Sequence, residues 1–193
     1  MDNARGRWRG IAPWLAAGVF YSAFAIVQTW PLVTKLSEVV ASDPGDPLLN
    51  TWILWWNAHA VPVTTRWWNA PSFFPATGAL AFSEVLLGLA PLTTPIQWLG
   101  HTPVAAYNVA FLVTFPLSAL AAHALAHRLC GRHDAATIAG LVYGFSPYRV
   151  AHFPQIQLLT SFWMPLALLG LHEYVSSKKR RWLAILRSFT NIA

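Results

Sequence analysis

A polar turn near position 45 is the first place in the chain where side chains could do chemistry. Residues 42–50 read SDPGDPLLN, and Asp43 and Asp46 in it each precede a proline. An aspartate followed by proline is typical of the start of a helix, where the carboxylate caps the first turn. The same carboxylate could act as a general base on an acceptor hydroxyl. Both roles can hold together, so Asp46 is the first catalytic candidate and Asp43 the second.

The stretch after this turn, up to Ala60, is rich in tryptophan and has the spacing of a helix. At about 100° per residue, Asp46, Asn50 and Asn57 fall on one narrow stripe, while leucine and tryptophan spread over the other side. Tryptophan prefers the headgroup region of a membrane, where its ring is half-buried and its N–H stays hydrated. The pattern predicts an interfacial helix with a polar seam, in which Asn50 and Asn57 are candidate substrate-binding residues.

Glu84 stands near the start of an apolar segment, residues 79–100. One explanation is structural, because the helix dipole favours an acid in the first turn. The other is functional, because an ionised group entering an apolar helix usually needs a partner or a water-filled cavity. Glu84 is therefore also a candidate substrate-binding residue.

Residues 145–157, which read FSPYRVAHFPQIQ, form the most polar stretch of the second half of the chain. Arg149 in it could snorkel to a membrane surface or bind the phosphate of a lipid. His152 and Gln157 could complete a polar pocket with it or merely line the interface. All three are candidate substrate-binding residues.

No metal or cofactor site is predicted, although a requirement for a divalent metal stays open. His123 and His127 lie four residues apart, but no third ligand is near them in the sequence, and Arg128 follows directly. Histidines at the edge of a membrane explain this pair better than a metal site does. The chain also lacks a phosphate-binding glycine loop, a nucleophile elbow and a zinc signature.

The elements that would position these residues are membrane helices. Of the 193 residues, 55% are hydrophobic and only 10% are charged, whereas soluble domains carry about 25% charged residues. Ten of the 13 basic residues fall into three short groups between apolar segments: Arg5, Arg7 and Arg9; Arg128 and Arg132; Lys178, Lys179, Arg180, Arg181 and Arg187. Such grouping is typical of cytoplasmic loops, and it excludes the continuous basic face that nucleic-acid binding needs.

The sequence predicts an all-α, polytopic membrane helix bundle in one domain, 1–193, with its N-terminus in the cytoplasm. Spans are expected near residues 11–33, 104–126, 135–148 and 157–174, followed by a truncated fifth from Trp182 that leaves the domain incomplete. Residues 35–103 then form a large external loop bearing interfacial helices. Within this loop, residues 79–100 are expected to be interfacial or re-entrant, because a crossing there would move Arg128 and Arg132 outside.

Several of these motifs together resemble a known superfamily. They are GDPLLN at 45–50, the tryptophan-rich run at 52–57, FP at 74–75, SE at 83–84, LLG at 86–88, FSPYR at 145–149, QLL at 157–159 and WMPLAL at 163–168. They resemble the N-terminal part of bacterial membrane proteins grouped with the GT-C glycosyltransferases, which include protein mannosyltransferases and lipid A aminoarabinose transferases. The resemblance covers most of residues 11–175. Val85 and Gln155 stand where we expect histidines in these relatives.

The resemblance implies a bacterial inner-membrane enzyme whose first external loop carries a catalytic aspartate. By position this aspartate is Asp46, with Asp43 as the alternative. The implied sugar donor is a polyprenyl phosphate or diphosphate sugar, and Arg149 is the candidate for its phosphate. The implied partners are membrane lipid and this donor, with no nucleic acid and with the oligomeric state open.

A non-catalytic membrane protein, such as a transporter subunit or an assembly factor, is the alternative function. A transporter places its binding groups near the middle of the bilayer, often on broken helices. The polar candidates of this chain instead cluster at one predicted surface, which favours transfer of a sugar from a lipid-linked donor at the outer face.

Overall fold

The computed structural model describes residues 2–60 and 64–190, and the side chains of residues 10–60 and 64–177. The described part is 72% helix and contains no strand, so the all-α prediction is confirmed.

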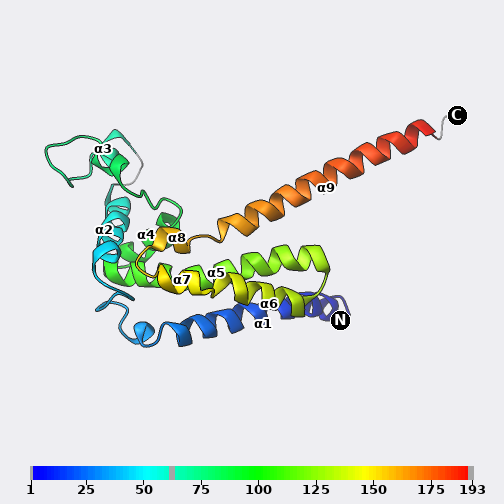
Figure 1. Ribbon diagram of the computed structural model, residues 1–193, viewed down its shortest axis with the longest axis horizontal. Coiled ribbons are helices and arrows are strands. Elements are labelled where there is room, and N and C mark those ends of the chain that lie inside the picture. Colours follow the sequence, from blue (N-terminus) through cyan, green and yellow to red (C-terminus); the bar gives the residue numbers. More distant parts are fainter. Residues whose placement is uncertain (1, 61–63, 191–193) are drawn as a thin grey trace.

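Three helices that lie along one another form the body of the molecule. They are α1 (Asp2–Gln28), α5 (Pro103–Cys130) and α6 (His133–Gly144) (Figure 1). A Cβ atom added at Gly144 would lie 2.7 Å from the Cβ of Ala119, and one added at Gly140 would lie 2.8 Å from the Ala119 carbonyl oxygen. The two glycines therefore let α6 approach the backbone of α5, as their spacing of four residues predicts.

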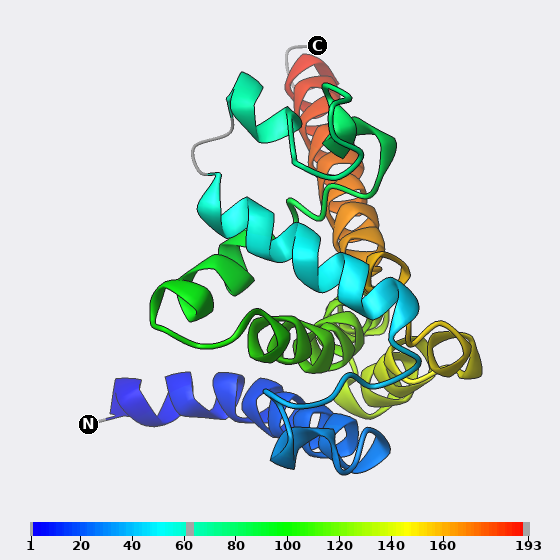
Figure 2. The ribbon, with the colours of Figure 1, turned by 90° about the vertical axis from the view of Figure 1, so that its left-hand side faces the viewer.

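A second group of elements covers one end of this body. It comprises η1 (Leu32–Thr34), α2 (Gly45–His59), α3 (Thr65–Trp68), η2 (Ala79–Phe82) and α4 (Ala90–Trp98). Helix α2 runs across the ends of the body helices (Figure 2). It buries Leu54 against Tyr107, Phe111 and neighbouring residues of α5, while Ile53 and Trp67 belong to a smaller core under α3 and η2.

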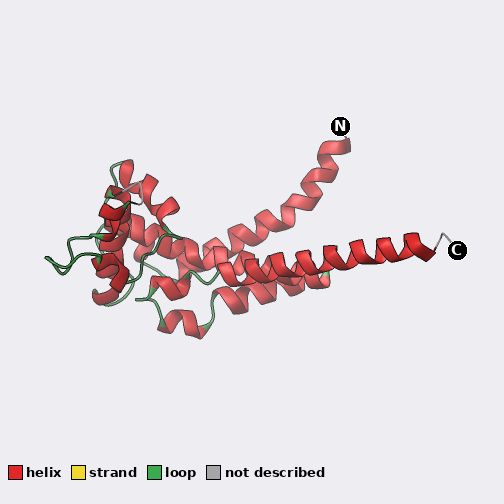
Figure 3. Cartoon of the chain, turned by 90° about the horizontal axis from the view of Figure 1, so that it is seen from above, coloured by secondary structure: helices red, strands yellow, loops and turns green. Residues whose placement is uncertain are grey.

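The remaining helices are α7 (Pro147–Ala151), α8 (Ile156–Leu159) and α9 (Trp163–Thr190). Helix α7 continues the course of α6 along α5, while α9 projects away from the body over most of its length (Figures 1 and 3). The break between α6 and α7 lies at Phe145 and Ser146, directly before Pro147, which disfavours helical backbone in the residue before it.

Two described helical segments are long and apolar enough to cross a membrane: Gly10–Gln28, with 19 residues, and Pro103–Cys130, with 28 residues. They coincide with the first two predicted spans. The segment predicted as the third span is divided between α6 and α7, and α6 alone, with 12 residues, is about 18 Å long. Residues 79–100 form no single long helix, since α4 has only 9 residues.

The last two predicted spans are not separate elements in the structure. The segment predicted as the fourth span, 157–174, starts as α8, breaks before Trp163 and continues as α9. Helix α9 then runs without interruption through Trp182, so no separate helix begins at the start of the predicted fifth span. The physical reason is that no glycine or proline occurs after Gly170, and the Lys and Arg residues that suggested a loop are good helix formers.

Candidate functional site

Three of the predicted site residues form a hydrogen-bonded chain where α2, α8 and the loop before α4 meet. Asn50 Nδ2 donates to Gln157 Oε1 at 3.3 Å, and Gln157 Nε2 donates to Glu84 Oε1 at 3.2 Å. The other carboxylate oxygen of Glu84 accepts from the Ser83 hydroxyl at 3.2 Å. Residues separated by 107 and 73 positions in the sequence thus form one polar group, which we call the amide–carboxylate chain.

Asp46 and Asp43 are not part of this chain. Asp46 is exposed in the first turn of α2, whose N-cap is Pro44 and has no side-chain hydrogen bond. The Asp43 carboxylate instead accepts from the backbone N–H of Gly45 at 3.1 Å, so it closes the turn that precedes the helix. Asp46 contributes to α2 through the helix dipole and not as its cap.

The two asparagines of the polar seam predicted for α2 face the protein and not a membrane surface, whereas Asp46 at the start of the seam is exposed. Asn50 and Asn57 are 1% and 2% exposed. Asn57 Nδ2 donates to the Val85 carbonyl oxygen at 2.9 Å, and the Trp67 indole N–H donates to Asn57 Oδ1 at 2.9 Å. Both polar atoms of Asn57 therefore hold the loop segments onto α2, as a buried amide requires.

Arg149 points into the molecule and does not snorkel outward. Its side chain is 2% exposed, and its guanidinium lies 4.8 Å from the centre of the Phe115 ring. The guanidinium donates four hydrogen bonds: to Leu159 O at 2.9 Å, Ser161 Oγ at 3.0 Å, Thr114 Oγ1 at 3.1 Å and Ser118 Oγ at 3.2 Å. None of these acceptors is charged, and the Nε atom has no partner among the described residues.

The guanidinium keeps its charge at neutral pH, because arginine is not deprotonated in proteins. The residues next to Arg149 in the sequence do not point to the hydroxyls that surround its guanidinium. Thr114 and Ser118 lie four residues apart in the apolar α5 and share one helix face. That spacing of two hydroxyls in an apolar span was the available signal for a buried polar partner.

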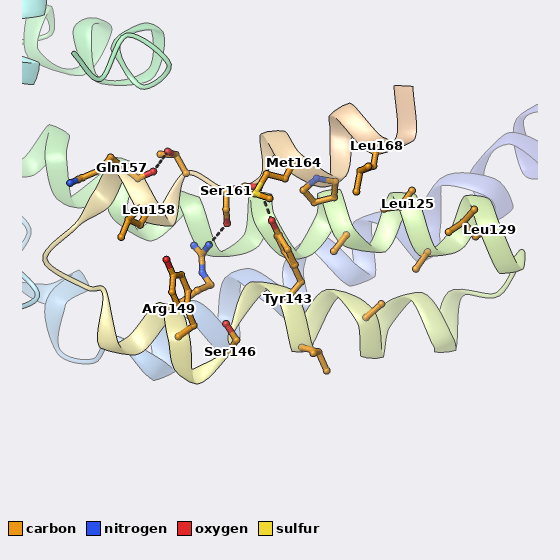
Figure 4. Close-up of a pocket in the computed structure, with 17 residues that line it drawn as sticks. Leu125, Leu129, Tyr143, Ser146, Arg149, Gln157, Leu158, Ser161, Met164 and Leu168 are labelled. Carbon is orange, nitrogen blue, oxygen red and sulfur yellow. Dashed lines mark hydrogen bonds between the residues drawn. The ribbon is translucent and has the colours of Figure 1, made fainter. Parts of the chain in front are cut away.

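A cavity of about 1150 Å³ opens from this guanidinium between α5, α6 and α9. Arg149 and Gln157 lie at one end of the cavity, whereas Leu125 and Leu129 lie toward the other, as Figure 4 shows. Alanine, valine, leucine and methionine side chains make up most of the remaining wall. The cavity is therefore amphipathic, with one polar end and a long apolar part.

His152 is not part of this arrangement. Its Nδ1 lies 2.7 Å from the backbone carbonyl oxygen of Tyr148, and its ring lies against the Tyr148 ring with the centroids 4.1 Å apart. These contacts stay within one turn of the chain. The structure thus separates His152 from Gln157, with which it was grouped on sequence.

The histidine pair of α5 has a third imidazole beside it, contrary to the sequence analysis. His133, at the start of α6, lies with its Nδ1 3.1 Å from His123 Nε2, and its ring is stacked on His127 at 4.1 Å. The sequence does not reveal this neighbour, because only the turn between α5 and α6 brings His133 back beside His123 and His127. Among the described residues, no group of three or more His, Cys, Asp or Glu side chains is arranged to hold a metal ion.

Comparisons with protein-family models, curated proteins and solved structures find no match. The chemistry of the site therefore has to be argued from its own side chains. They combine an apolar cavity, a buried cation at its polar end and an exposed carboxylate, Glu84, that is one hydrogen bond away from the cavity wall at Gln157. Such a set can hold an amphipathic anion beside a group that accepts protons.

Proposed function

We propose that the protein is an integral membrane glycosyltransferase of GT-C type, which transfers a sugar from a polyprenyl-linked donor at the outer face of the membrane. The observation that carries this proposal is the amphipathic cavity that ends at Arg149, a buried cation with no carboxylate among its partners. The apolar part suits a polyprenyl chain, and the guanidinium suits the phosphate that joins the chain to the sugar.

The electrostatics of Arg149 support an anionic ligand. Burying a charge is costly unless an opposite charge or a full set of hydrogen bonds compensates it. Hydroxyl and carbonyl oxygens accept from both terminal nitrogens here, three at Nη1 and one at Nη2, but they leave the net charge uncompensated and Nε without a partner among the described residues. A phosphate would supply the missing charge, and arginine binds phosphate through short, charge-assisted hydrogen bonds.

The arrangement of the helices supports a location in the bacterial cytoplasmic membrane. Large apolar side chains on α1 are exposed, including Leu15, Val19, Phe20 and Val27, and they would face lipid. In Figure 1 the N-terminus and the turn between α5 and α6 lie at one end of the body, and α9 runs toward the same side. This arrangement supports a topology in which the three basic groups of the sequence lie on the cytoplasmic side of a membrane crossed by α1, α5, α6 with α7, and α9.

The proposed reaction breaks the bond between the sugar and the lipid phosphate. An external carboxylate takes the proton of the acceptor hydroxyl, and the acceptor oxygen attacks the anomeric carbon. The lipid phosphate leaves with the electron pair of the broken bond, and Arg149 stabilises its charge. The resemblance assigns the carboxylate to Asp46, on the same external side of the molecule as Glu84.

Lipid binding tests this proposal. The protein in detergent micelles is titrated with a polyprenyl phosphate and, separately, with the uncharged polyprenol of the same chain length. Hydrogen bonds to charged groups are worth about 1.5–3 kcal/mol. The wild type should therefore prefer the phosphate by roughly tenfold or more, since about 1.4 kcal/mol is one factor of ten.

Two variants locate the binding site. Arg149→Met should remove the preference for phosphate. That change also leaves buried hydroxyls without a donor, so a second variant is needed. Ala139→Phe fills the apolar part of the cavity and should weaken the binding of polyprenyl phosphate and polyprenol alike. A wild type that binds both lipids equally contradicts the proposal, whereas tight binding without sugar transfer would favour the non-catalytic alternative.

A further inference from the structure

We propose that Glu84 is the catalytic base and that Gln157 is the residue that positions it. This assignment rests on the proposed function, and it replaces the one that the sequence favours for Asp46. It follows from the hydrogen bonds that connect the cavity to the loop before α4.

Gln157 belongs both to the wall of the cavity and to the amide–carboxylate chain. Its side chain lines the polar end of the cavity together with Arg149. The same side chain donates from Nε2 to Glu84 and accepts at Oε1 from Asn50. Because both ends of the amide are engaged, the amide has one preferred orientation, and it holds the Glu84 carboxylate next to the place where the lipid phosphate would lie.

Glu84 combines this proximity with access from water. Its side chain is exposed, so an acceptor hydroxyl can approach from outside. Each carboxylate oxygen can accept two hydrogen bonds, and each oxygen has one within the described residues, from Gln157 or Ser83. One acceptor position on each oxygen therefore stays open for the acceptor hydroxyl.

Asp46 lacks such a connection. Its carboxylate makes no hydrogen bond among the described residues, and its relation to the amide–carboxylate chain is only that Asn50 lies one turn further along α2. Asp46 interacts electrostatically with Tyr107, whose hydroxyl is buried and has no hydrogen-bond partner in the described part. That interaction points toward the α5 core and not toward the cavity.

The chemical step assigns each atom to a group in the structure. A Glu84 oxygen takes the proton from the acceptor hydroxyl as the acceptor oxygen forms a bond to the anomeric carbon of the sugar. The bond from that carbon to the phosphate oxygen breaks, and its electron pair leaves with the lipid phosphate at Arg149. The proton then passes from Glu84 to water, to which its carboxylate is exposed.

The test measures release of sugar from synthetic polyprenyl-phosphate hexoses, with water as the acceptor and with the full chain in membranes. Glu84→Gln should lower the rate by about 10²–10⁴-fold, the usual contribution of a general base. Its preference for polyprenyl phosphate over polyprenol should be that of the wild type. Glu38→Gln is the matched control, because Glu38 is an exposed carboxylate of the same external segment without a side-chain hydrogen bond in the described part, and it should leave the rate unchanged.

Two further measurements separate a base from a structural residue. Formate added to Glu84→Ala should restore part of the rate, since a small carboxylate can occupy the vacated position, and it should not affect Glu38→Ala. Gln157→Met should lower kcat more than it changes lipid binding, because it removes the amide that orients Glu84 and keeps a side chain of similar length in the cavity wall.

The outcomes distinguish this inference from the function on which it rests. Unchanged release by Glu84→Gln, or a larger loss in Asp46→Asn than in Glu84→Gln, overturns the assignment of Glu84 and leaves lipid-linked transfer standing. A wild type that prefers the lipid phosphate but releases no sugar refutes any catalytic role for Glu84. A wild type without that preference refutes both proposals.

Discussion

The contact between α5 and α6 makes a sharp prediction about Gly140. A Cβ atom at this position would overlap the hydroxyl of Tyr21 and lie 2.8 Å from the backbone carbonyl oxygen of Ala119. The tyrosine could turn away, but the carbonyl belongs to the middle of α5 and cannot move without the helix. Gly140→Ala should therefore push α6 away from both α1 and α5.

Opposing contributions to the free energy of unfolding set the size of the effect of Gly140→Ala. Alanine in place of glycine stabilises a helix interior by about 1 kcal/mol. Overpacking a tight contact costs about 1–3 kcal/mol. The Tyr21 hydroxyl would also lose its hydrogen bonds to the Thr137 carbonyl at 3.2 Å and to His123 at 3.0 Å, at a cost of about 1 kcal/mol or more. The net expectation is a destabilisation of roughly 1–3 kcal/mol.

Denaturant unfolding in detergent micelles, followed by tryptophan fluorescence, measures this change. Gly170→Ala in α9 is the matched control, because an added Cβ meets no atom within 4 Å there, and it should be neutral or slightly stabilising. Adding Tyr21→Phe to Gly140→Ala should recover part of the loss, since it removes the overlapping hydroxyl. If Gly140→Ala is as stable as Gly170→Ala, the close approach of α6 to α5 is refuted.

Three other predictions concern orientation, the loop core and the buried cation. Cysteines that replace Arg66 and His152, which follows α7, should react with an impermeant thiol reagent added outside the cell, whereas native Cys130 and a cysteine at position 179 should not; the reverse pattern would contradict the orientation. Asn57→Ala should destabilise the protein by roughly 2–4 kcal/mol in the same unfolding assay, because each buried polar group left without a partner costs about 1–3 kcal/mol; an unchanged midpoint would mean that Asn57 does not tie the loop to α2. The preference for lipid phosphate should be constant from neutral to alkaline pH, because an arginine keeps its charge over that range, and a fall just above neutral pH in binding titrations would assign the anion to another group.

The local pattern of the sequence was sufficient to predict the two long apolar helices. Apolar length identified the segments that became α1 and α5, and the four-residue spacing of Gly140 and Gly144 is typical of a tight helix contact, which α6 makes with α5. These features depend on residues within one or two helical turns of each other. The periodicity of α2 likewise placed Asn50 and Asn57 on a common face.

The sequence could not determine what covers that face. Lipid headgroups and protein can both form hydrogen bonds to an amide, and only the packing of α3, α8 and the loop before α4 against α2 decided for protein. For the same reason, Arg149 was expected at a surface, because its neighbours in the sequence, Tyr148 and Val150, gave no sign of buried acceptors for its guanidinium. The hydroxyls of Thr114 and Ser118, more than 30 residues away, turn it inward.

The candidate site is therefore a product of the tertiary structure. The amide–carboxylate chain joins residues 73 and 107 positions apart, and the cavity lies between helices that meet only after α5, α6 and α9 have packed. Periodicity along a helix states which residues share a face, because that depends on backbone geometry alone. Which two faces meet depends on the burial of apolar surface and on hydrogen bonds between distant segments, and these are decided only when the whole chain has folded.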